Sequence, residues 1–247
     1  MTSNTATALI TGGTSGIGRA TANKMAQLGI HVLMVGRNAQ RGKKAVDEIR
    51  AAGGQADFIS ADLHDAAGAR AVAKKAIELG NGRVDILINN AGIYPFGPTH
   101  DMTNEQFDRV YSINVKAPYF LVAELAPLMA ERGKGAIVNL STMAADYGVP
   151  GMSLYGSSKA AINLLTKTWA AEYGPRGVRV NAVSPGPTRT EGTEAMRDDL
   201  EQMAAQAPAG RPATADEIAE AIVFLATERA SFIYGAKLAV DGGRTAV

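Results

Sequence analysis

The chain has 247 residues, of which 46% are hydrophobic and 20% are charged. This composition is typical of a folded globular protein and excludes an intrinsically disordered chain, and the length fits one large α/β domain or two small ones. With 25 Lys and Arg against 24 Asp and Glu, the net charge of +1 gives no overall positive field, so we expect no nucleic-acid partner.

Residue types that bind metals or form disulfides are scarce. The chain has no cysteine, which excludes disulfides and thiol nucleophiles. Its histidines, His31, His64 and His100, are more than thirty residues apart, so we expect no metal site. The N-terminus has no positive residue before its apolar stretch, and no apolar run approaches the roughly 18 residues of a membrane helix. We therefore expect a soluble cytoplasmic protein without a membrane partner.

Short apolar runs alternate with longer amphipathic segments along the chain, as in β-α-β units. The runs are rich in Val, Ile and Leu and are bounded by Gly, Asn or Asp, which favours strands buried on both faces of a parallel sheet. We predict strands at residues 6–11, 31–35, 56–60, 84–89, 135–140, 178–184 and 237–240. We predict helices at about residues 17–28, 39–52, 65–79, 117–132, 155–173 and 214–227, the last opening with a capping box of Thr214 and Glu217.

One architecture accounts for these elements. The sequence predicts a single-domain α/β protein over residues 1–247, with a doubly wound Rossmann fold and a seven-stranded parallel sheet flanked by helices. Residues 187–212 match no sheet element and are long for a connection, so we expect a substrate lid or binding loop there.

A glycine-rich turn, TGGTSGIG at residues 11–18, follows the first predicted strand and leads into a predicted helix. Glycines let a backbone turn tightly and approach a phosphate, and a helix N-terminus offers free N–H groups to an anion. A P-loop is disfavoured because Arg19 and Ala20 stand where it needs Lys and Ser or Thr. The pattern predicts a dinucleotide phosphate site, with a purely structural turn as the alternative.

The end of the second predicted strand favours NADP over NAD. A site for an unmodified ribose has Asp or Glu about 20 residues beyond the glycines, whereas the first acidic residue of this chain is Asp47. Arg37 stands at the strand end instead, and a guanidinium can bind a 2′-phosphate with two hydrogen bonds. We expect the nearby Lys43 and Lys44 on a solvated helix face.

Tyr155 and Lys159 are four residues apart, which places them on the same face of a helix. A free phenol has a pKa near 10, and a nearby ammonium lowers that pKa toward neutrality. The pair predicts a tyrosine that can exchange protons with a substrate, while a chance surface pair is the alternative.

Together these motifs resemble the classical short-chain dehydrogenase/reductase family over essentially the whole chain. The matching motifs are residues 11–18, Asp62-Leu63, Asn89-Asn90-Ala91-Gly92, Asn114, Tyr155 with Lys159, Pro185-Gly186 and Asp241-Gly242-Gly243. The resemblance implies a nicotinamide cofactor and metal-free hydride transfer between a carbonyl and an alcohol.

The resemblance implies a catalytic set of Asn114, Thr142, Tyr155 and Lys159. Tyr155 would be the general acid/base, Lys159 would lower its pKa and hold the nicotinamide ribose, and Asn114 would anchor a water relay. Thr142 stands thirteen residues before the tyrosine, where the family usually has a serine that polarises the substrate oxygen. Threonine keeps the hydroxyl donor, but its methyl group stiffens the side chain and narrows the pocket. A structural role for Thr142 is the alternative, and Ser141 could replace it only if the strand end is rotated.

The resemblance also implies ligand contacts. Those expected for NADP(H) are Gly12, Ser15, Gly16, Ile17, Gly18, Arg37, Asp62, Leu63, Asn90, Ala91, Gly92, Tyr155, Lys159, Pro185, Gly186, Thr188 and Thr190. Those expected to line the substrate are Ile93, Tyr94, Met143, Ala144 and Met152, whose mostly apolar character favours a neutral or hydrophobic carbonyl compound over a keto acid. Asp62 could instead cap the following helix, and we expect Asn89 to be a structural buttress.

The expected function is therefore NADP(H)-dependent interconversion of a ketone and a secondary alcohol. A 3-oxoacyl-thioester (acyl-carrier-protein) reductase shares every motif, although the sequence shows no clear basic patch for a carrier. An enoyl reductase fits less well, because its tyrosine and lysine are usually separated by six residues rather than three. A catalytically silent NADP-binding sensor or scaffold is the non-enzyme alternative. The apolar helix after Tyr155 and the resemblance together imply a homotetramer.

Overall fold

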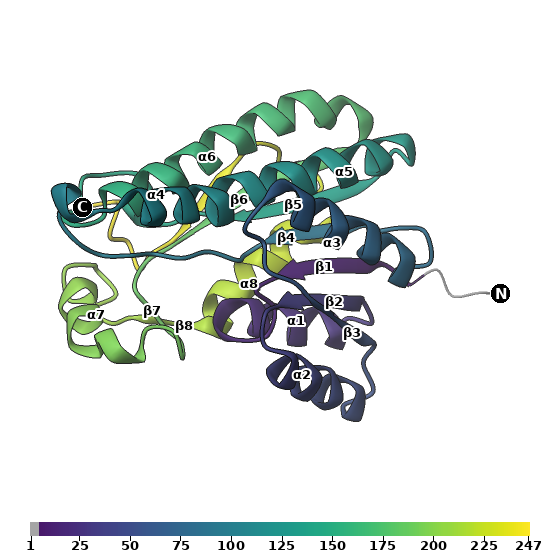
Figure 1. Ribbon diagram of the computed structural model, residues 1–247, viewed down its shortest axis with the longest axis horizontal. Helices are drawn as coiled ribbons and strands as arrows, with labels where there is room; N and C mark the ends of the chain where they lie inside the picture. The colour runs from purple at the N-terminus through teal and green to yellow at the C-terminus, as the bar shows by residue number, and fades with distance from the viewer. Residues whose placement is uncertain (1–4) are drawn as a thin grey trace.

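The computed structural model describes residues 5–247; residues 1–4 of the predicted domain lie outside the described residues. A seven-stranded sheet with the order β3-β2-β1-β4-β5-β6-β9 forms its centre, and every neighbouring pair is parallel (Figure 1). The strands are β1 (Thr7–Thr11), β2 (His31–Gly36), β3 (Ala56–Ser60), β4 (Ile86–Asn89), β5 (Gly135–Leu140), β6 (Val178–Pro185) and β9 (Lys237–Val240). The predicted sheet is confirmed, and each predicted strand boundary lies within two residues of the observed one.

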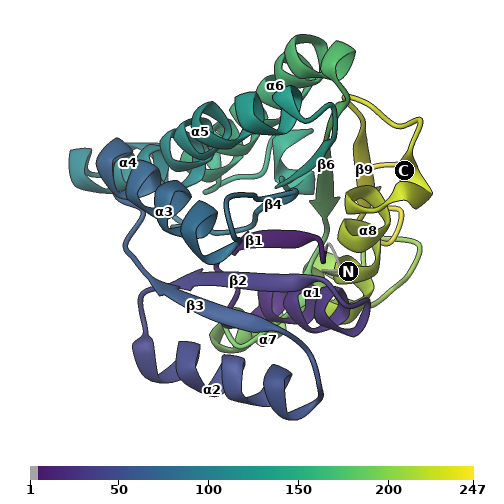
Figure 2. The same ribbon diagram turned by 90° about the vertical axis from the view of Figure 1, so that its right-hand side faces the viewer.

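Helices cover both faces of the sheet (Figure 2). Because side chains alternate along a strand, β1 serves two cores: Leu9 packs with α3 (Ala66–Leu79), α5 (Ala117–Glu131) and α6 (Ser153–Tyr173). Ala8 and Ile10 pack on the other face with α1 (Gly16–Gln27), α2 (Ala39–Ala51) and α8 (Ala215–Ala226). Single 3₁₀ turns lie at Thr99–Asp101, Met143–Ala145, Gly174–Arg176, Glu194–Met196 and Glu228–Ala230.

The sequence prediction missed two helical segments between β4 and α5. Helix α4 (Asn104–Tyr111) begins with a capping box of Thr103 and Gln106. It runs into a π-helical turn at Ser112–Lys116, which leads directly into α5.

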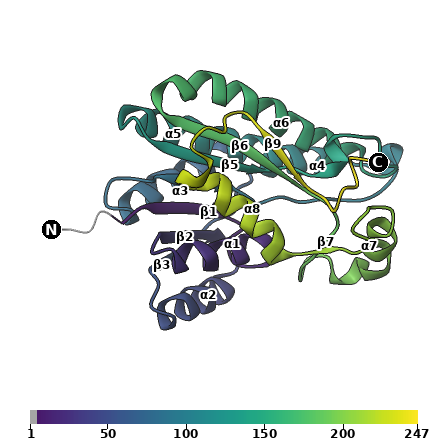
Figure 3. The same ribbon diagram turned by 180° about the vertical axis from the view of Figure 1, so that it is seen from behind.

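Residues 187–212 are more regular than predicted. Strand β7 (Thr188–Arg189) pairs with β8 (Ala213–Thr214) in a separate two-stranded sheet, and α7 (Arg197–Ala204) lies between them in the chain. The expectation that this segment matches no sheet element was therefore wrong. Figure 3 shows α7 and β7 at the end of the molecule toward which β1 runs, apart from the main sheet.

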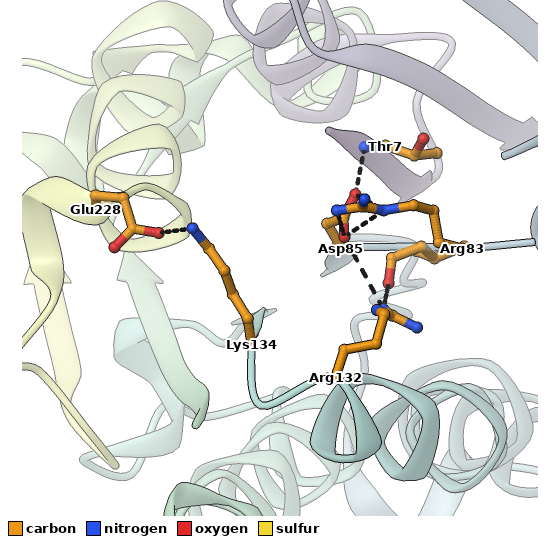
Figure 4. Close-up of polar contacts among 7 residues, drawn as sticks. Thr7, Arg83, Asp85, Arg132, Lys134 and Glu228 are labelled. Atoms are coloured by element: carbon orange, nitrogen blue, oxygen red, sulfur yellow. Dashed lines mark hydrogen bonds and ion pairs between the residues drawn. The ribbon is translucent and has the colours of Figure 1, made fainter. Parts of the chain in front are cut away.

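The opposite edge of the sheet, where the parallel strands begin, carries a polar network (Figure 4). The Asp85 carboxylate accepts a hydrogen bond from the Thr7 amide at 2.9 Å and pairs with the Arg83 guanidinium at 2.6 Å. Arg132 donates to the Val84 carbonyl oxygen at 2.7 Å, which joins the end of α5 to the start of β4. These contacts hold the amino ends of β1 and β4 together and leave the carboxyl edge free of them.

No helix within residues 5–247 is long and apolar enough to cross a membrane. Nor do three or more His, Cys, Asp or Glu residues of that range gather closely enough to hold a metal ion.

Candidate active site

A cleft of about 1130 Å³ lies at the carboxyl edge of the sheet. The strand order reverses between β1 and β4, and ligands of open α/β sheets bind outside such a reversal. The lining comes from the glycine turn, the ends of β2 to β6, α6 and residues 185–203. Every predicted site residue lines this cleft except Gly18 and Asn114.

The glycine turn between β1 and α1 requires its glycines. Gly12 and Gly16 have φ angles of +64° and +51°, which residues with a Cβ rarely adopt. A Cβ on Gly18 would collide with the Gly12 carbonyl oxygen. The Asn90 amide nitrogen donates to the carbonyl oxygens of Thr11 and Gly12 at 2.8 and 3.2 Å. Gly18 and the Asn90 amide group thus contact the backbone of the turn and fix its shape.

Two guanidinium groups stand at the cleft beside the end of β2. Arg37 and Arg41 both line it, and neither side chain has a hydrogen bond or ion pair within the part of the chain that the structure describes. In contrast, Lys43 and Lys44 form exposed pairs with Asp47 and Glu48, as expected for a solvated helix face. This end of the cleft therefore presents uncompensated positive charge to an anion.

Asp62 lies in the same part of the cleft. The carboxylate that caps α3 belongs to Asp65, which accepts from the Gly68 amide at 2.7 Å. The alternative that Asp62 caps this helix was wrong, and its exposed side chain lies beside the buried Leu63 in the cleft wall.

Lys159 and Asn114 meet beneath the opposite half of the cleft. Lys159 is only 4% exposed, and its ammonium donates to the Leu140 carbonyl oxygen at 2.7 Å. Asn114 is fully buried in the π-helical turn; it bonds both backbone groups of Ile93 at 2.9 Å and the Ser158 hydroxyl at 3.0 Å. A Cβ on Gly92 would lie 3.3 Å from both the Asn114 Oδ1 and the Lys159 Nζ atoms. Asn114 therefore holds the loop after β4 against α6 instead of facing the cleft.

Tyr155 and Thr142 face each other in the cleft wall. Thr142 lies close enough to Tyr155 for its hydroxyl to lower the pKa of the phenol, and this hydroxyl accepts a hydrogen bond from the Ala144 amide at 3.3 Å. The Ser141 hydroxyl is buried and has no partner among residues 5–247. The observed contact to Tyr155 thus belongs to Thr142.

The pKa of Tyr155 moves in the direction opposite to the predicted one. Burial raises this pKa to about 12, against a lowering effect of the Thr142 hydrogen bond. Burial also lowers the pKa of Lys159 to about 8. The expected net lowering of the Tyr155 pKa was wrong for this structure, because burial of the phenol dominates and the Lys159 ammonium is hydrogen-bonded to the Leu140 carbonyl group.

The part of the cleft around Tyr155 is apolar and aromatic. The Tyr94 ring packs edge to face against Tyr155 with centroids 6.0 Å apart, and its hydroxyl donates to the Gly192 carbonyl oxygen at 2.8 Å. The cleft lining includes Ile93, Met143, Ala144 and Met152, whose predicted role as substrate contacts stays a prediction, and it also includes Met196, Leu200 and Met203, which the sequence analysis missed. Met196, Leu200 and Met203 are spaced by four and three residues, as on one face of a helix, and this spacing could have identified them in the sequence.

Two contacts of the sheet shape the surroundings of the cleft, and the sequence analysis predicted one of them. Asn89 donates to Asn139 at 2.8 Å, and Asn139 donates to Thr166 at 2.9 Å, so the structural role expected of Asn89 is confirmed. Gly186 packs against Asp241, where a Cβ would lie 2.8 Å from the Asp241 Cα atom. This contact fixes the start of the segment that carries Thr188 and Thr190 over the cleft.

Comparisons with known proteins agree with this geometry. The family model described as enoyl-(acyl carrier protein) reductase matches residues 12–245. A solved structure described as a short-chain dehydrogenase/reductase family protein is 50% identical, with a TM-score of 0.91 and 98% of each chain covered. Cyclopentanol dehydrogenase of Comamonas sp. (strain NCIMB 9872) is 36% identical over 241 residues, which are 96% of each chain.

A further solved structure contains a nucleotide. Gluconate 5-dehydrogenase from Burkholderia cenocepacia J2315, in complex with NADP and tartrate, is 30% identical with a TM-score of 0.92, over 98% of this chain and 96% of that one. From the sheet order, the ordered motifs and these similarities, the chain belongs to the classical short-chain dehydrogenase/reductase family of oxidoreductases.

Proposed function

We propose that this protein is an NADP(H)-dependent oxidoreductase that interconverts a ketone and a secondary alcohol, with Tyr155 as the general acid/base. The observation that carries the proposal is the continuity of one cleft. It joins the guanidinium groups of Arg37 and Arg41, whose side chains have no partner among residues 5–247, through the glycine turn to the neighbouring Tyr155 and Thr142.

The residues present fit a phosphorylated dinucleotide. Arg37 and Arg41 suit a 2′-phosphate, Asp62 and Leu63 an adenosine, and the backbone of the glycine turn a pyrophosphate. Lys159 and residues 185–190 would hold the nicotinamide end. The cleft volume exceeds the roughly 300–1,000 Å³ typical of small-molecule sites, which leaves room for a substrate. The NADP complex of the gluconate 5-dehydrogenase supports this cofactor.

Side chains of this protein would supply the proton that the reduction of a carbonyl group requires. When bound, NADPH supplies the hydride for reduction. With a pKa of about 12, Tyr155 is protonated at neutral pH and can give its phenolic proton to the carbonyl oxygen. Thr142 can donate a hydrogen bond to the same oxygen. Lys159, with a pKa of about 8, is largely charged at neutral pH and would stabilise the tyrosinate that remains.

The substrate we favour is a neutral, apolar ketone or alcohol. The substrate end presents methionines, tyrosines and aliphatic residues, and the unpaired Arg37 and Arg41 lie at the adenosine end. Methionine adapts to irregular apolar shapes, and the name of the cyclopentanol dehydrogenase is consistent with this class. A 3-oxoacyl thioester is the second candidate, because a 3-oxoacyl-[acyl-carrier-protein] reductase of Thermotoga maritima is 35% identical to this chain over 236 residues.

The test is NADPH consumption by wild type and Tyr155→Phe with aryl ketones, cyclic ketones, β-ketoesters, 3-oxoacyl thioesters and sugars. We expect Tyr155→Phe to lose about 10²–10⁴-fold in rate while NADPH still binds, because only the proton donor is removed. Tyr111→Phe is the control, since its hydroxyl bonds the exposed Ser157 outside the cleft. Turnover retained by Tyr155→Phe contradicts its role as proton donor. NADPH binding without any turnover favours the silent sensor or scaffold.

We also propose self-association as a homotetramer through α5 and α6. Tyr119 of α5 packs against Trp169 of α6 with ring centroids 6.1 Å apart, and Leu164 of α6 is 67% exposed. Exposed apolar side chains on two helices that pack together suit a subunit contact. The cytoplasmic location stays a prediction.

A further inference from the structure

An acidic side chain from the segment after β6 lies on the glycine turn. The Glu191 carboxylate accepts a hydrogen bond from the Gly16 amide at 2.9 Å. Gly16 is the first residue of α1, and the amides of a first helical turn have no partner within the helix. Ser15 supplies no side-chain cap, and the first turn of α1 contains no acidic residue. Glu191 is thus the negative group at the positive end of this helix dipole.

The position of the Glu191 carboxylate on the Gly16 amide is not explained by an ion pair with a neighbouring arginine. Arg19 and Arg189 line the same shallow pocket as Glu191, but each binds another carboxylate: Arg19 pairs with Glu48 at 2.8 Å and Arg189 with Glu201 at 2.6 Å. Glu191 has no ion pair with any residue of the range 5–247. Its single partner in the structure is therefore the helix amide.

The backbone on both sides of Glu191 is held over the cleft. A Cβ on Gly16 would lie 3.2 Å from the Thr190 side chain, so residue 190 packs directly on the turn. On the other side, the Gly192 carbonyl oxygen accepts the Tyr94 hydroxyl at 2.8 Å. Residues 190–192 therefore cross from the glycine turn to the loop after β4, above the path that a bound dinucleotide would follow.

We propose that Glu191 is an internal ligand of the pyrophosphate site, which NADP(H) displaces when it binds. The inference rests on the proposed function, because the pyrophosphate of the cofactor would use the amides at the start of α1. One amide hydrogen cannot serve a carboxylate and a phosphate fully, and the two negative groups repel each other. The carboxylate consequently lowers the affinity for the cofactor, and cofactor binding moves residues 190–192 away from Gly16.

The test compares NADPH dissociation constants, measured from nicotinamide fluorescence at fixed ionic strength, for wild type, Glu191→Gln and Glu194→Gln. The neutral amide of Glu191→Gln competes less for the helix N-terminus, so its Kd for NADPH should fall about threefold to tenfold. Glu194→Gln removes an exposed carboxylate from the same segment, one that faces Arg197 at 3.7 Å, and should leave Kd unchanged.

Adenosine 2′-monophosphate is the matched ligand, because it carries the 2′-phosphate without the pyrophosphate. Its affinity should be the same for wild type and Glu191→Gln. Unchanged or weaker NADPH binding by Glu191→Gln overturns the inference, and so does an equal gain for adenosine 2′-monophosphate, which would indicate a general charge effect. If wild type binds neither ligand, the proposed function itself fails.

Discussion

Burial decides the protonation of the two titratable residues at the reactive end of the cleft. It pushes the pKa of Tyr155 up to about 12 and the pKa of Lys159 down to about 8, because a charge is poorly solvated in both places. The resting site therefore holds a protonated phenol beside an ammonium that titrates close to neutrality. This state is suited to giving a proton to a carbonyl oxygen.

The rate of ketone reduction should consequently fall as pH rises through about 8. Lys159 is charged below its pKa and neutral above it, whereas Tyr155 stays protonated until about pH 12. In the mechanism that we propose, loss of the ammonium removes the charge that would stabilise the tyrosinate. The measurement is kcat/KM for NADPH-dependent reduction across this range, with samples returned to neutral pH as a control for unfolding. A profile that stays flat well above pH 8 would remove Lys159 from this role.

Arg37 should set the preference between the two nicotinamide cofactors. A charged hydrogen bond to a 2′-phosphate contributes about 1.5–3 kcal/mol, so Arg37→Ala should weaken NADPH binding by about tenfold to hundredfold and change NADH binding little. Lys43→Ala is the matched control, because Lys43 pairs with Asp47 outside the cleft. Equal affinities of the parent protein for NADPH and NADH would contradict the argument.

At the scale of elements, the tight turn between β1 and α1 requires a glycine inside the helix, although glycine is a poor helix former. Gly18 lies inside α1, where alanine would favour the helix by about 1 kcal/mol. The Cβ of Gly18→Ala would nevertheless meet the backbone oxygen of Gly12 and the amide of Asn90. We expect a lower free energy of unfolding and weaker NADPH binding, measured by urea titration and fluorescence. Asn23→Ala on the same helix, at a partly exposed position, should impair neither property.

The elements that the sequence predicted share one property: their hydrophobic pattern reports burial directly. The Val, Ile and Leu runs of the seven strands and the capping box at Thr214 are local signals, and both are present in the structure. Helix α4 was missed because it is short and only Val110 in it is buried. The pairing of Thr188 with Ala213 joins residues 25 positions apart, which no local pattern reveals.

Prediction of the site was limited in a similar way. Nearly all predicted site residues line one cleft, because their motifs follow the carboxyl ends of parallel strands, which lie together at one side of the sheet. The sequence could not predict the hydrogen bond from Lys159 to the Leu140 carbonyl group or the pKa of Tyr155 raised by burial, since both depend on how the elements pack together. Nor could it show that Asn114 faces Ile93 and Ser158 from a π-helical turn.

At the scale of the molecule, the amino ends and the carboxyl ends of the parallel strands differ in what they carry. The amino edge is tied by Asp85, Arg83 and Arg132, and the carboxyl edge carries the cleft (Figure 4). Figures 1 and 2 show α5 and α6 side by side on one face of the sheet. Arg132 at the end of α5 belongs to the amino-edge contacts and the first turns of α6 line the cleft, whereas the exposed Tyr119 and Leu164 lie outside both. This face is therefore available for assembly without blocking the cleft.

Assembly through this face makes a specific prediction for Leu164. Its side chain is 67% exposed on α6, and Tyr119 of the neighbouring α5 is 47% exposed. Leu164→Lys would bury a charge in the proposed contact and should reduce the mass of the particle in analytical ultracentrifugation. Leu28→Lys changes a similarly exposed leucine at the end of α1, on the other face of the sheet, and should leave the mass at that of wild type. A monomeric wild type contradicts self-association, whereas an unchanged mass for Leu164→Lys moves the contact away from α6.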